Sequence, residues 1–396
     1  MSTKTSPASV ASEITLSRAL DIVRLQVLAD QPTLLIGPPG LGKSAAVQQI
    51  VDDLSTDDYV YEMVDIRLGQ MDVPDLRGLP LLKGDTTLET RPHWFPEEGK
   101  TREIEVSPAT ADTPAKTKRV PVRYLIFLDE ITSAVPTMQA AAYQIVLERQ
   151  IGTFKLPPET RVLAAGNRME DNAVVHFMSS ALRSRFCIVN VKTDQQAWDK
   201  WAMGSGVDER VIAFIRHKPG MLSDYSQMKQ QSYPCPRTWD MLSQSLQQLP
   251  QSTDDKTIDS VEILASGMVG QGASLDFSTF VRTCQDLPNI EALLEGKVRF
   301  TIPDDPSAVD LGLIFGLTTA VAMRADASYK GKYIDAIFKF ALSIPQHLKE
   351  FRVRVGIDAI NVNPEVLAAC TDEKNHPNVS TWFTEVGHTL ALMDTA

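Results

Sequence analysis

The chain has 396 residues and is 43% hydrophobic, and its 39 basic and 50 acidic residues give a formal net charge of −11. This length is enough for two or three domains with a sizeable core. The charge disfavours a general nucleic-acid-binding protein, while leaving room for a local basic channel. The four cysteines are scattered without a C-x-x-C pair, which argues against a disulfide framework or a zinc site and predicts a reducing, cytoplasmic location.

Short apolar strands alternate with helices over the first half of the chain. We predict strands at residues 33–36, 59–64, 124–128, 162–165 and 186–191 and helices at 44–54 and 137–148. Alternation of this kind is typical of a parallel sheet with helices on both faces. Ligands of such sheets bind at the carboxyl ends of the strands, where most of the motifs below are found.

The segment between the first predicted strand and the following helix carries a phosphate-binding pattern. It reads Gly37-Pro38-Pro39-Gly40-Leu41-Gly42-Lys43-Ser44, which fits G-x-x-x-x-G-K-[ST]. Glycines at a strand-to-helix turn let backbone N–H groups surround an anion at the helix N-terminus. Lys43 would bind the outer phosphates and Ser44 would ligate Mg²⁺. The alternative is a plain glycine turn that caps a helix, and the complete motif favours the nucleotide site.

Two carboxylates, Asp129 and Glu130, follow the apolar strand 124–128. Asp129 can hold Mg²⁺ opposite Ser44, and Glu130 can orient and polarise the attacking water. The alternative is a solvated acidic turn, but after a phosphate-binding loop we favour the catalytic interpretation, and hydrolysis over transfer. The preceding segment, residues 97–119, is rich in Glu, Thr, Lys and Pro, and we expect a flexible surface insertion there.

The residues alone do not decide the role of three further sites. Asn167 follows the strand 162–165 and is either a group beside the terminal phosphate or a turn asparagine. Arg183 and Arg185 precede the strand 186–191 and either reach into a neighbouring subunit or are surface arginines, which is the commoner case. Arg237 follows a proline at a predicted helix start, and a surface position is again the commoner case for it.

From about residue 192 the strand signals fade and amphipathic helical patterns follow one another. Helices are predicted at residues 209–216, 238–249, 258–269 and 333–342. The longest uncharged apolar stretch, residues 311–323, is too short to cross a bilayer, so we expect a buried helix and no membrane span. The predicted fold is an α/β nucleotide-binding core over residues 1–191 and a helical lid with a C-terminal helical region over residues 192–396.

Taken in chain order, these motifs resemble those of the AAA+ ATPases. Residues 65–80 are similar to the MoxR group within them and read Asp-Ile-Arg-Leu-Gly-Gln-Met-Asp-Val-Pro-Asp-Leu-Arg-Gly-Leu-Pro. The resemblance implies a five-stranded parallel core, a helical lid, and a hexameric ring with ATP and Mg²⁺ between subunits. It identifies residues 37–44 as Walker A and Asp129 with Glu130 as Walker B. Sensor 1 would be Asn167.

The resemblance also assigns the arginines and the pore. Arg185 looks like the arginine finger, Arg183 like a second arginine acting across the subunit interface, and Arg237 like the sensor 2 arginine of the lid. Residues 67–99 and a hairpin at residues 150–156 would face the pore. Family members often remodel a protein client together with a partner that bears a von Willebrand factor A domain. Arg168 departs from the pattern, because proline is common at this position in relatives.

Two other function classes use similar parts. A nucleic-acid-stimulated motor should carry clustered basic and aromatic residues in its loops, but acidic side chains outnumber basic ones over residues 67–99. A non-catalytic ATP-dependent scaffold would not need the Asp129–Glu130 pair. We therefore favour an ATPase that remodels a protein client.

Overall fold

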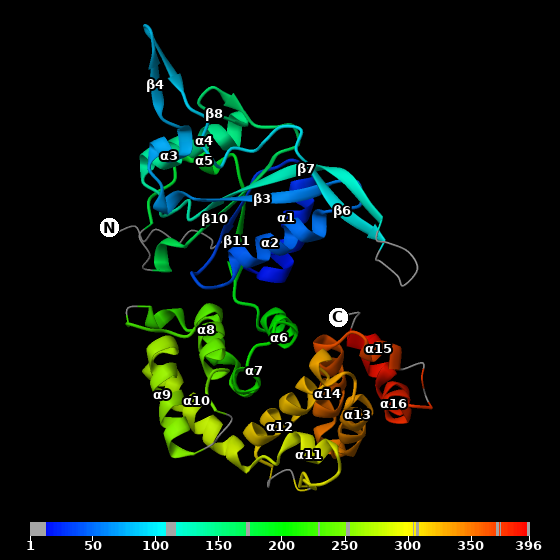
Figure 1. Cartoon of the computed structure of the whole chain (residues 1–396). Coiled ribbons are helices and arrows are strands. Elements are labelled where there is room, and N and C mark those ends of the chain that lie inside the picture. Colours follow the sequence, from blue (N-terminus) through cyan, green and yellow to red (C-terminus); the bar gives the residue numbers. More distant parts are fainter. Residues whose placement is uncertain are drawn as a thin grey trace, which may run out of the picture. The chain divides into compact units, whose positions relative to one another are not determined.

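The computed structural model describes residues 13–107, 116–171, 175–228, 230–250, 254–303, 305, 309–369, 372 and 374–393 (Figure 1). Contacts along the chain divide it into two compact units, Met1–Asp194 and Gln195–Ala396. The first unit is a sheet covered by helices, and the second is helical.

The sheet of the first unit has the strand order β1-β11-β2-β10-β7-β3, and each neighbouring pair along this path is parallel. The predicted parallel five-stranded core is confirmed as β11-β2-β10-β7-β3. Two further strands, which the sequence pattern did not predict, extend it, β1 at one edge and β6 antiparallel to β7. The strands are β1 (Ile14–Thr15), β2 (Thr33–Ile36), β3 (Val60–Arg67), β6 (Thr101–Ser107), β7 (Lys116–Asp129), β10 (Arg161–Gly166) and β11 (Cys187–Lys192).

Both faces of the sheet are buried, because successive side chains of each strand point to opposite faces. Leu34 packs in the cluster that holds Met138 and Ile145 of α4 (Pro136–Glu148), whereas Leu35 packs with Val47 and Ile50 of α2 (Lys43–Leu54). Helix α1 (Leu16–Leu28) shares the second face with α2, and α3 (Val73–Arg77) shares the first with α4 (Figure 1). This double burial explains the uninterrupted apolar runs of the strands.

The register of the central strands brings their carboxyl ends to one edge. Ile36 of β2 pairs with Gly166 of β10, and Leu128 of β7 pairs with Ala164 of β10. The loops that follow β2, β7 and β10 therefore meet at this edge. These are the loops in which the sequence placed its phosphate-binding and carboxylate motifs.

Residues 97–119 differ from the expected flexible insertion. Within the described part, β6 pairs antiparallel with the first half of β7, from Thr101 opposite Pro121 to Ser107 opposite Lys116. A long two-stranded ribbon thus extends the central strand β7, and residues 108–115 lie outside the described residues. In the sequence of β6, charged residues stand on both sides of Ile104, which is compatible with a strand, whereas the polar composition of residues 97–119 had favoured a loop.

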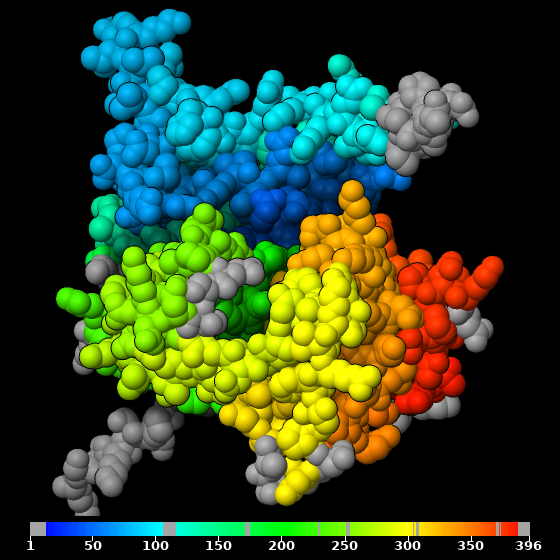
Figure 2. Space-filling model, turned by 60° about the horizontal axis from the view of Figure 1, so that its bottom comes forward, coloured from blue at the N-terminus to red at the C-terminus, as the bar shows by residue number. Residues whose placement is uncertain are grey.

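Two hairpins lie on the side of the sheet that α4 covers (Figure 1). One pairs β4 (Pro80–Lys83) with β5 (Thr86–Glu89), and the other pairs β8 (Gln150–Ile151) with β9 (Phe154–Lys155). In the space-filling view the first hairpin forms a light-blue projection from the first unit (Figure 2). The hairpin predicted at residues 150–156 is present.

The second unit contains two apolar cores. The helices of the first are α6 (Gln195–Gly204), α7 (Glu209–His217), α8 (Pro236–Leu246), α9 (Asp255–Val269) and α10 (Gln271–Thr283). Those of the second are α11 (Ile290–Leu294), α12 (Leu311–Met323), α13 (Ile334–Ser343), α14 (Lys349–Val362), α15 (Val366–Ala369) and α16 (Pro377–Met393). Helix α12 has the predicted bounds and is largely buried.

A buried ion-pair network joins these two cores. The Arg216 guanidinium of α7, which is 1% exposed, donates to Asp199 of α6 at 2.6 Å and to Asp358 of α14 at 2.7 Å. It also donates to Thr319 Oγ1 of α12 at 3.2 Å. Among the described residues, no helix combines the length and the apolar character needed to span a bilayer.

Candidate functional site

The loop after β2 has the backbone that its glycines were predicted to permit. Gly40 and Gly42 have φ of 75° and 95°, in the left-handed region that favours glycine. Gly37 lies so close to β11 that an added Cβ would stand 2.5 Å from Val191 Cγ2 and 2.8 Å from its carbonyl oxygen. Gly42 is the N-cap of α2 and provides no side chain for its first turn. The loop is therefore an open cradle at a helix N-terminus, as an anion site requires.

Lys43 holds its ammonium inside this cradle. The side chain is buried, and Nζ donates to the carbonyl oxygens of Gly37 at 2.8 Å and Pro38 at 2.9 Å. A longer bond, of 3.3 Å, reaches Asn167 Oδ1 at the end of β10. These three acceptors are neutral oxygens, so the anionic oxygens of a phosphate would be stronger partners for the ammonium.

Ser44 and Asp129 face each other across the strand ends. Ser44 Oγ donates to Asp129 Oδ2 at 2.8 Å, and Asp129 Oδ1 accepts the backbone N–H of Glu130 at 2.8 Å. A hydroxyl and a carboxylate are hard oxygen ligands, which is the donor set that Mg²⁺ prefers beside phosphate oxygens. The pair therefore fits a magnesium ion held between α2 and β7.

Glu130 has an unusual backbone for a residue that is not glycine. Its φ is 56°, a left-handed conformation that carries a strain of about 1–3 kcal/mol. The side chain lies against Gly69 of the short 3-10 helix Leu68–Gln70, where an added Cβ would be 2.8 Å from Glu130 Oε2. Gly69 thus makes room for the Glu130 carboxylate, a role that no local pattern in the sequence signalled.

Asn167 is held by a residue that the sequence analysis missed. Its backbone N–H donates to Thr132 Oγ1 at 2.8 Å, and the Thr132 carbonyl accepts the N–H of His176 at 2.7 Å. Thr132 is buried, and an added Cβ on Gly166 would stand 2.7 Å from its Oγ1. A threonine two residues beyond the Asp-Glu pair was the only available signal.

The three arginines predicted for the site are not brought together with Lys43 in this unit. Arg183 ends the short helix α5 (Ser180–Arg183), and both Arg183 and Arg185 are exposed. Because Cys187 pairs with Thr33 at the start of β2, these arginines precede the strands whose opposite ends carry the cradle. Arg237 belongs to the second unit, where it is exposed on the first turn of α8, and its role stays a prediction.

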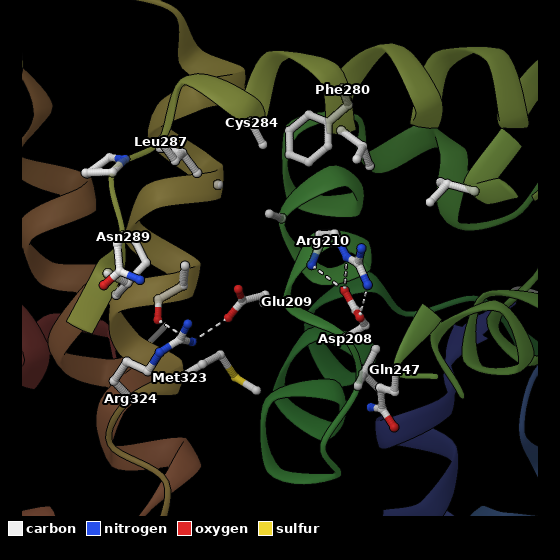
Figure 3. A pocket seen from close by; sticks show the side chains of 18 of the residues that line it. Asp208, Glu209, Arg210, Gln247, Phe280, Cys284, Leu287, Asn289, Met323 and Arg324 are labelled. Carbon is white, nitrogen blue, oxygen red and sulfur yellow. Dashed lines mark hydrogen bonds and ion pairs between the residues drawn. The ribbon is translucent and has the colours of Figure 1, made fainter. Parts of the chain in front are cut away.

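The second unit has a cavity of its own, of 380 Å³, lined by residues of α7, α9, α10, α11 and α12 (Figure 3). Its charged side chains form ion pairs with one another. Arg210 donates to Asp208 at 2.7 Å, and Arg324 donates to Glu209 at 2.6 Å. Burial, with the carboxylates of Asp310 and Glu209 nearby, raises the pKa of the Cys284 thiol to about 12, so this thiol stays protonated. The described residues that line this cavity include no lysine and no glycine-rich turn at a helix start like that of the first unit.

The site in the first unit combines a helix N-terminus, a buried ammonium, a hydroxyl–carboxylate pair and a second carboxylate. The first three can bind a polyphosphate and its cation, and the last can accept a proton from water. This arrangement suits hydrolysis of a phosphoanhydride. The groups come from the ends of β2, β7 and β10, which are adjacent in the sheet.

Comparison with known families gives one match that covers these groups. Residues 33–191 match the family described as "ATPase family associated with various cellular activities (AAA)". The matched range includes the cradle, Asp129, Glu130, Asn167 and Arg185. Comparison with curated proteins gives no match.

Solved structures with a similar course of the chain include two bacterial proteins. The RuvB Holliday junction branch migration motor of Thermotoga maritima is 15% identical, with a TM-score of 0.31, over 71% of this chain and 75% of that one. NtrX of Brucella abortus is 11% identical, with a TM-score of 0.33, over 88% of this chain and 69% of that one. Likenesses this loose carry no argument about function. Of these comparisons, only the family match over residues 33–191 is used below.

The Thr132 hydroxyl predicts a measurable effect on the first unit. In Thr132→Val, the N–H of Asn167 loses its acceptor in a part-buried place, which should lower the free energy of unfolding by about 1–3 kcal/mol. Thr160→Val is the matched control, since this buried threonine only donates, to the Pro157 carbonyl, and leaves no N–H unpaired. Urea unfolding and hydrogen exchange of the Asn167 amide measure both variants, and equal losses in the two would contradict the assignment.

Proposed function

We propose that this chain, of which residues 33–191 match the AAA ATPase family, hydrolyses ATP with Mg²⁺ in a ring-shaped oligomer and uses the energy to remodel a protein client, as MoxR-like chaperones do. The observation that carries the proposal is the contact between Ser44 and Asp129 beside the buried Lys43 ammonium. The further parts of the proposal are the subunit interface and the client surface.

The cradle residues would bind and orient the triphosphate. Lys43 would leave the carbonyls of Gly37 and Pro38 for the outer phosphates, while the first turn of α2 directs its N–H groups at the same charge. Ser44 and Asp129 would hold Mg²⁺, which neutralises charge on the phosphate oxygens when bound. A single subunit would make all of these contacts.

Glu130 and Asn167 would act on the attacking water. Glu130 follows Asp129 directly, its backbone is left-handed, and its carboxylate occupies the space at Gly69. As general base it would accept a proton from water. Asn167 already contacts the Lys43 ammonium through its amide oxygen, so its side chain would lie beside an outer phosphate bound by that ammonium.

The position of Arg185 and Arg183 supports a site shared between subunits. Both are exposed and precede β11, at the opposite end of the parallel strands from the cradle. An arginine there cannot reach the cradle of its own subunit without crossing the sheet, whereas it can enter that of a neighbour in a ring. An arginine supplied in this way neutralises charge that develops on the transferred phosphoryl group. We assign Arg237 to the helical lid, as the residue that couples phosphate loss to lid movement.

The two segments that the family resemblance places at the pore are packed together. The N–H of Thr153, at the β8–β9 turn, donates to Glu89 Oε2 of β5 at 3.1 Å. The rings of Phe95 and Phe154 are 5.9 Å apart, with the Arg91 guanidinium 5.7 Å from the Phe154 ring. A movement of one hairpin would therefore carry the other with it, which suits a client-contacting device that responds to the nucleotide.

The β4–β5 hairpin presents apolar side chains to solvent. Leu82 is 85% exposed, and Leu79, Leu81 and Leu88 are also exposed. Contiguous exposed apolar side chains mark protein contact sites more often than nucleic-acid sites, which are basic. This observation favours a protein client, reached directly or through a von Willebrand factor A domain partner, over a nucleic-acid motor.

Replacing Glu130 should separate binding from turnover. Glu130→Gln keeps the size of the side chain but removes the base, so ATP hydrolysis should fall by about 10²-fold or more while ATP affinity stays nearly unchanged. Lys43→Ala should instead weaken nucleotide binding itself. Phosphate release and titration with a fluorescent ATP analogue measure the two effects. Turnover near that of the wild type in Glu130→Gln would remove Glu130 from this role.

Arg185→Ala tests the shared site. Hydrolysis should fall by about 10³-fold with ATP affinity nearly intact, because the arginine contributes to the transition state only. Mixed with Lys43→Ala subunits, it should regain activity, since a mixed interface can combine an intact cradle with an intact arginine. Failure to recover at every mixing ratio would argue against an arginine that acts between subunits.

The hairpin leucines test the client surface. A Glu130→Gln chain held in the ATP state should retain host proteins, and adding Leu81→Ser and Leu82→Ser should release them because the apolar contact is lost. Leu25→Ser with Leu28→Ser is the matched control, since these α1 leucines are each 64% exposed but lie outside the hairpin. Quantitative mass spectrometry compares the retained sets, and equal retention by both variants would contradict a role for the hairpin.

A further inference from the structure

Arg168, which follows Asn167, forms ion pairs with two carboxylates that no local motif in the sequence indicated. Its guanidinium forks onto Asp171, with Nε 3.0 Å and Nη2 2.8 Å from Oδ1, and its backbone N–H donates to Asp171 Oδ2 at 3.0 Å. Nη1 donates to Glu13 Oε1 at 2.7 Å. Asp171 is 2% exposed, while Arg168 and Glu13 are partly exposed. One side chain thus joins the turn after β10 to the residue just before β1, 155 positions earlier.

Burial alone would lower the pKa of Arg168. The hydrogen bonds and charges of Asp171 and Glu13 outweigh burial and hold this pKa above its usual range. The guanidinium is therefore charged at every working pH. The backbone of the turn is closed as well, since the N–H of Asp171 donates to the Arg168 carbonyl at 3.3 Å.

These contacts complete a closed ring of residues that includes Gly37 and Lys43 of the phosphate-binding loop. On one side, Arg168 is bonded through the chain to Asn167, whose amide oxygen contacts the Lys43 ammonium. On the other side, Arg168 holds Glu13, and the next residue, Ile14, pairs with Val191 of β11.

Val191 closes the ring, because it lies against Gly37, the first residue of the loop. Gly37 in turn gives its carbonyl oxygen to Lys43 Nζ and its N–H to Gly166 at 3.2 Å. Every link of this ring is a hydrogen bond, an ion pair, a strand pairing, a van der Waals contact or a peptide bond.

We propose that Arg168 is a positioning residue for ATP hydrolysis, which acts through Asp171 and Glu13 to hold Asn167 and the segment before β1 in place around the phosphate-binding loop. The inference rests on the proposed function, because it presupposes that Asn167 acts on the hydrolytic step. Positioning contacts of this kind change the rate of chemistry more than they change ground-state binding.

A substitution at Glu13 can distinguish a positioning role of the network from a role in folding. Removing Arg168 would leave Asp171 buried without its cation, and such a variant is expected to unfold readily. Glu13→Gln removes only the partly exposed ion pair, which contributes little to stability. Glu62→Gln is the matched control, since Glu62 pairs with Lys100 at similar exposure but lies near the start of β3, away from the cradle.

Steady-state phosphate release, titration with a fluorescent ATP analogue and thermal unfolding are measured on the full chain. For Glu13→Gln we expect kcat to fall by about tenfold with the ATP dissociation constant nearly unchanged. The melting temperature should shift no more than it does in Glu62→Gln. Glu13→Asp, which keeps the charge, should recover part of the lost rate, and a rate no better than that of Glu13→Gln would contradict the role of the ion pair.

Two outcomes are distinguishable. A Glu13→Gln chain that hydrolyses ATP as fast as Glu62→Gln, beside an active wild type, would overturn this inference and leave the proposed function intact. A wild-type chain that releases no phosphate would refute the proposed function, and the inference would fall with it.

Discussion

Parallel pairing of β2 with β10, and of β10 with β7, is the constraint on which the site depends. It aligns Ile36, Gly166 and Asp129 at one edge of the sheet, so that the residues following three separate strands meet. A shift of one residue in any of these registers would turn Asp129 away from Ser44 and point the apolar side chains of the strand at the wrong face. The alternating burial of Leu34 and Leu35 against different helices holds the register in place.

The polar contacts of the site are arranged on that rigid edge. Lys43 donates to Asn167 and the next residue, Ser44, donates to Asp129, while Thr132 and Gly166 fix the backbone beside Asn167. Side chains held by a packed sheet lose little freedom when a ligand binds, and this preorganisation is what a hydrolytic site requires. The strained backbone of Glu130 sits at the same edge, where strain is commonly found in functional sites.

The second unit is held together in a different way. Two apolar cores meet at a seam where Arg216 binds Asp199 and Asp358 away from solvent. Removing one partner of such a buried network is costly because it leaves an uncompensated charge, whereas the intact network is no more stabilising than well-packed apolar residues of similar volume. The amphipathic pattern indicated the helices of this unit, and α12 has the predicted bounds, but no helical period could indicate that Arg216 would find partners on α6 and α14, as many as 142 positions away.

Local pattern determined the strands of the core, the phosphate-binding loop and the Asp129–Glu130 pair. Strands buried on both faces must be apolar throughout, and a phosphate-binding loop is formed by consecutive residues. Tertiary structure alone decided which residues support them. Gly69 leaves space for the Glu130 side chain, Thr132 accepts a hydrogen bond from Asn167, and Glu13 pairs with Arg168. The β6–β7 ribbon could not be recognised from the composition of its residues. Such contacts depend on strand order and register, which join positions far apart in the chain and leave no period in the sequence.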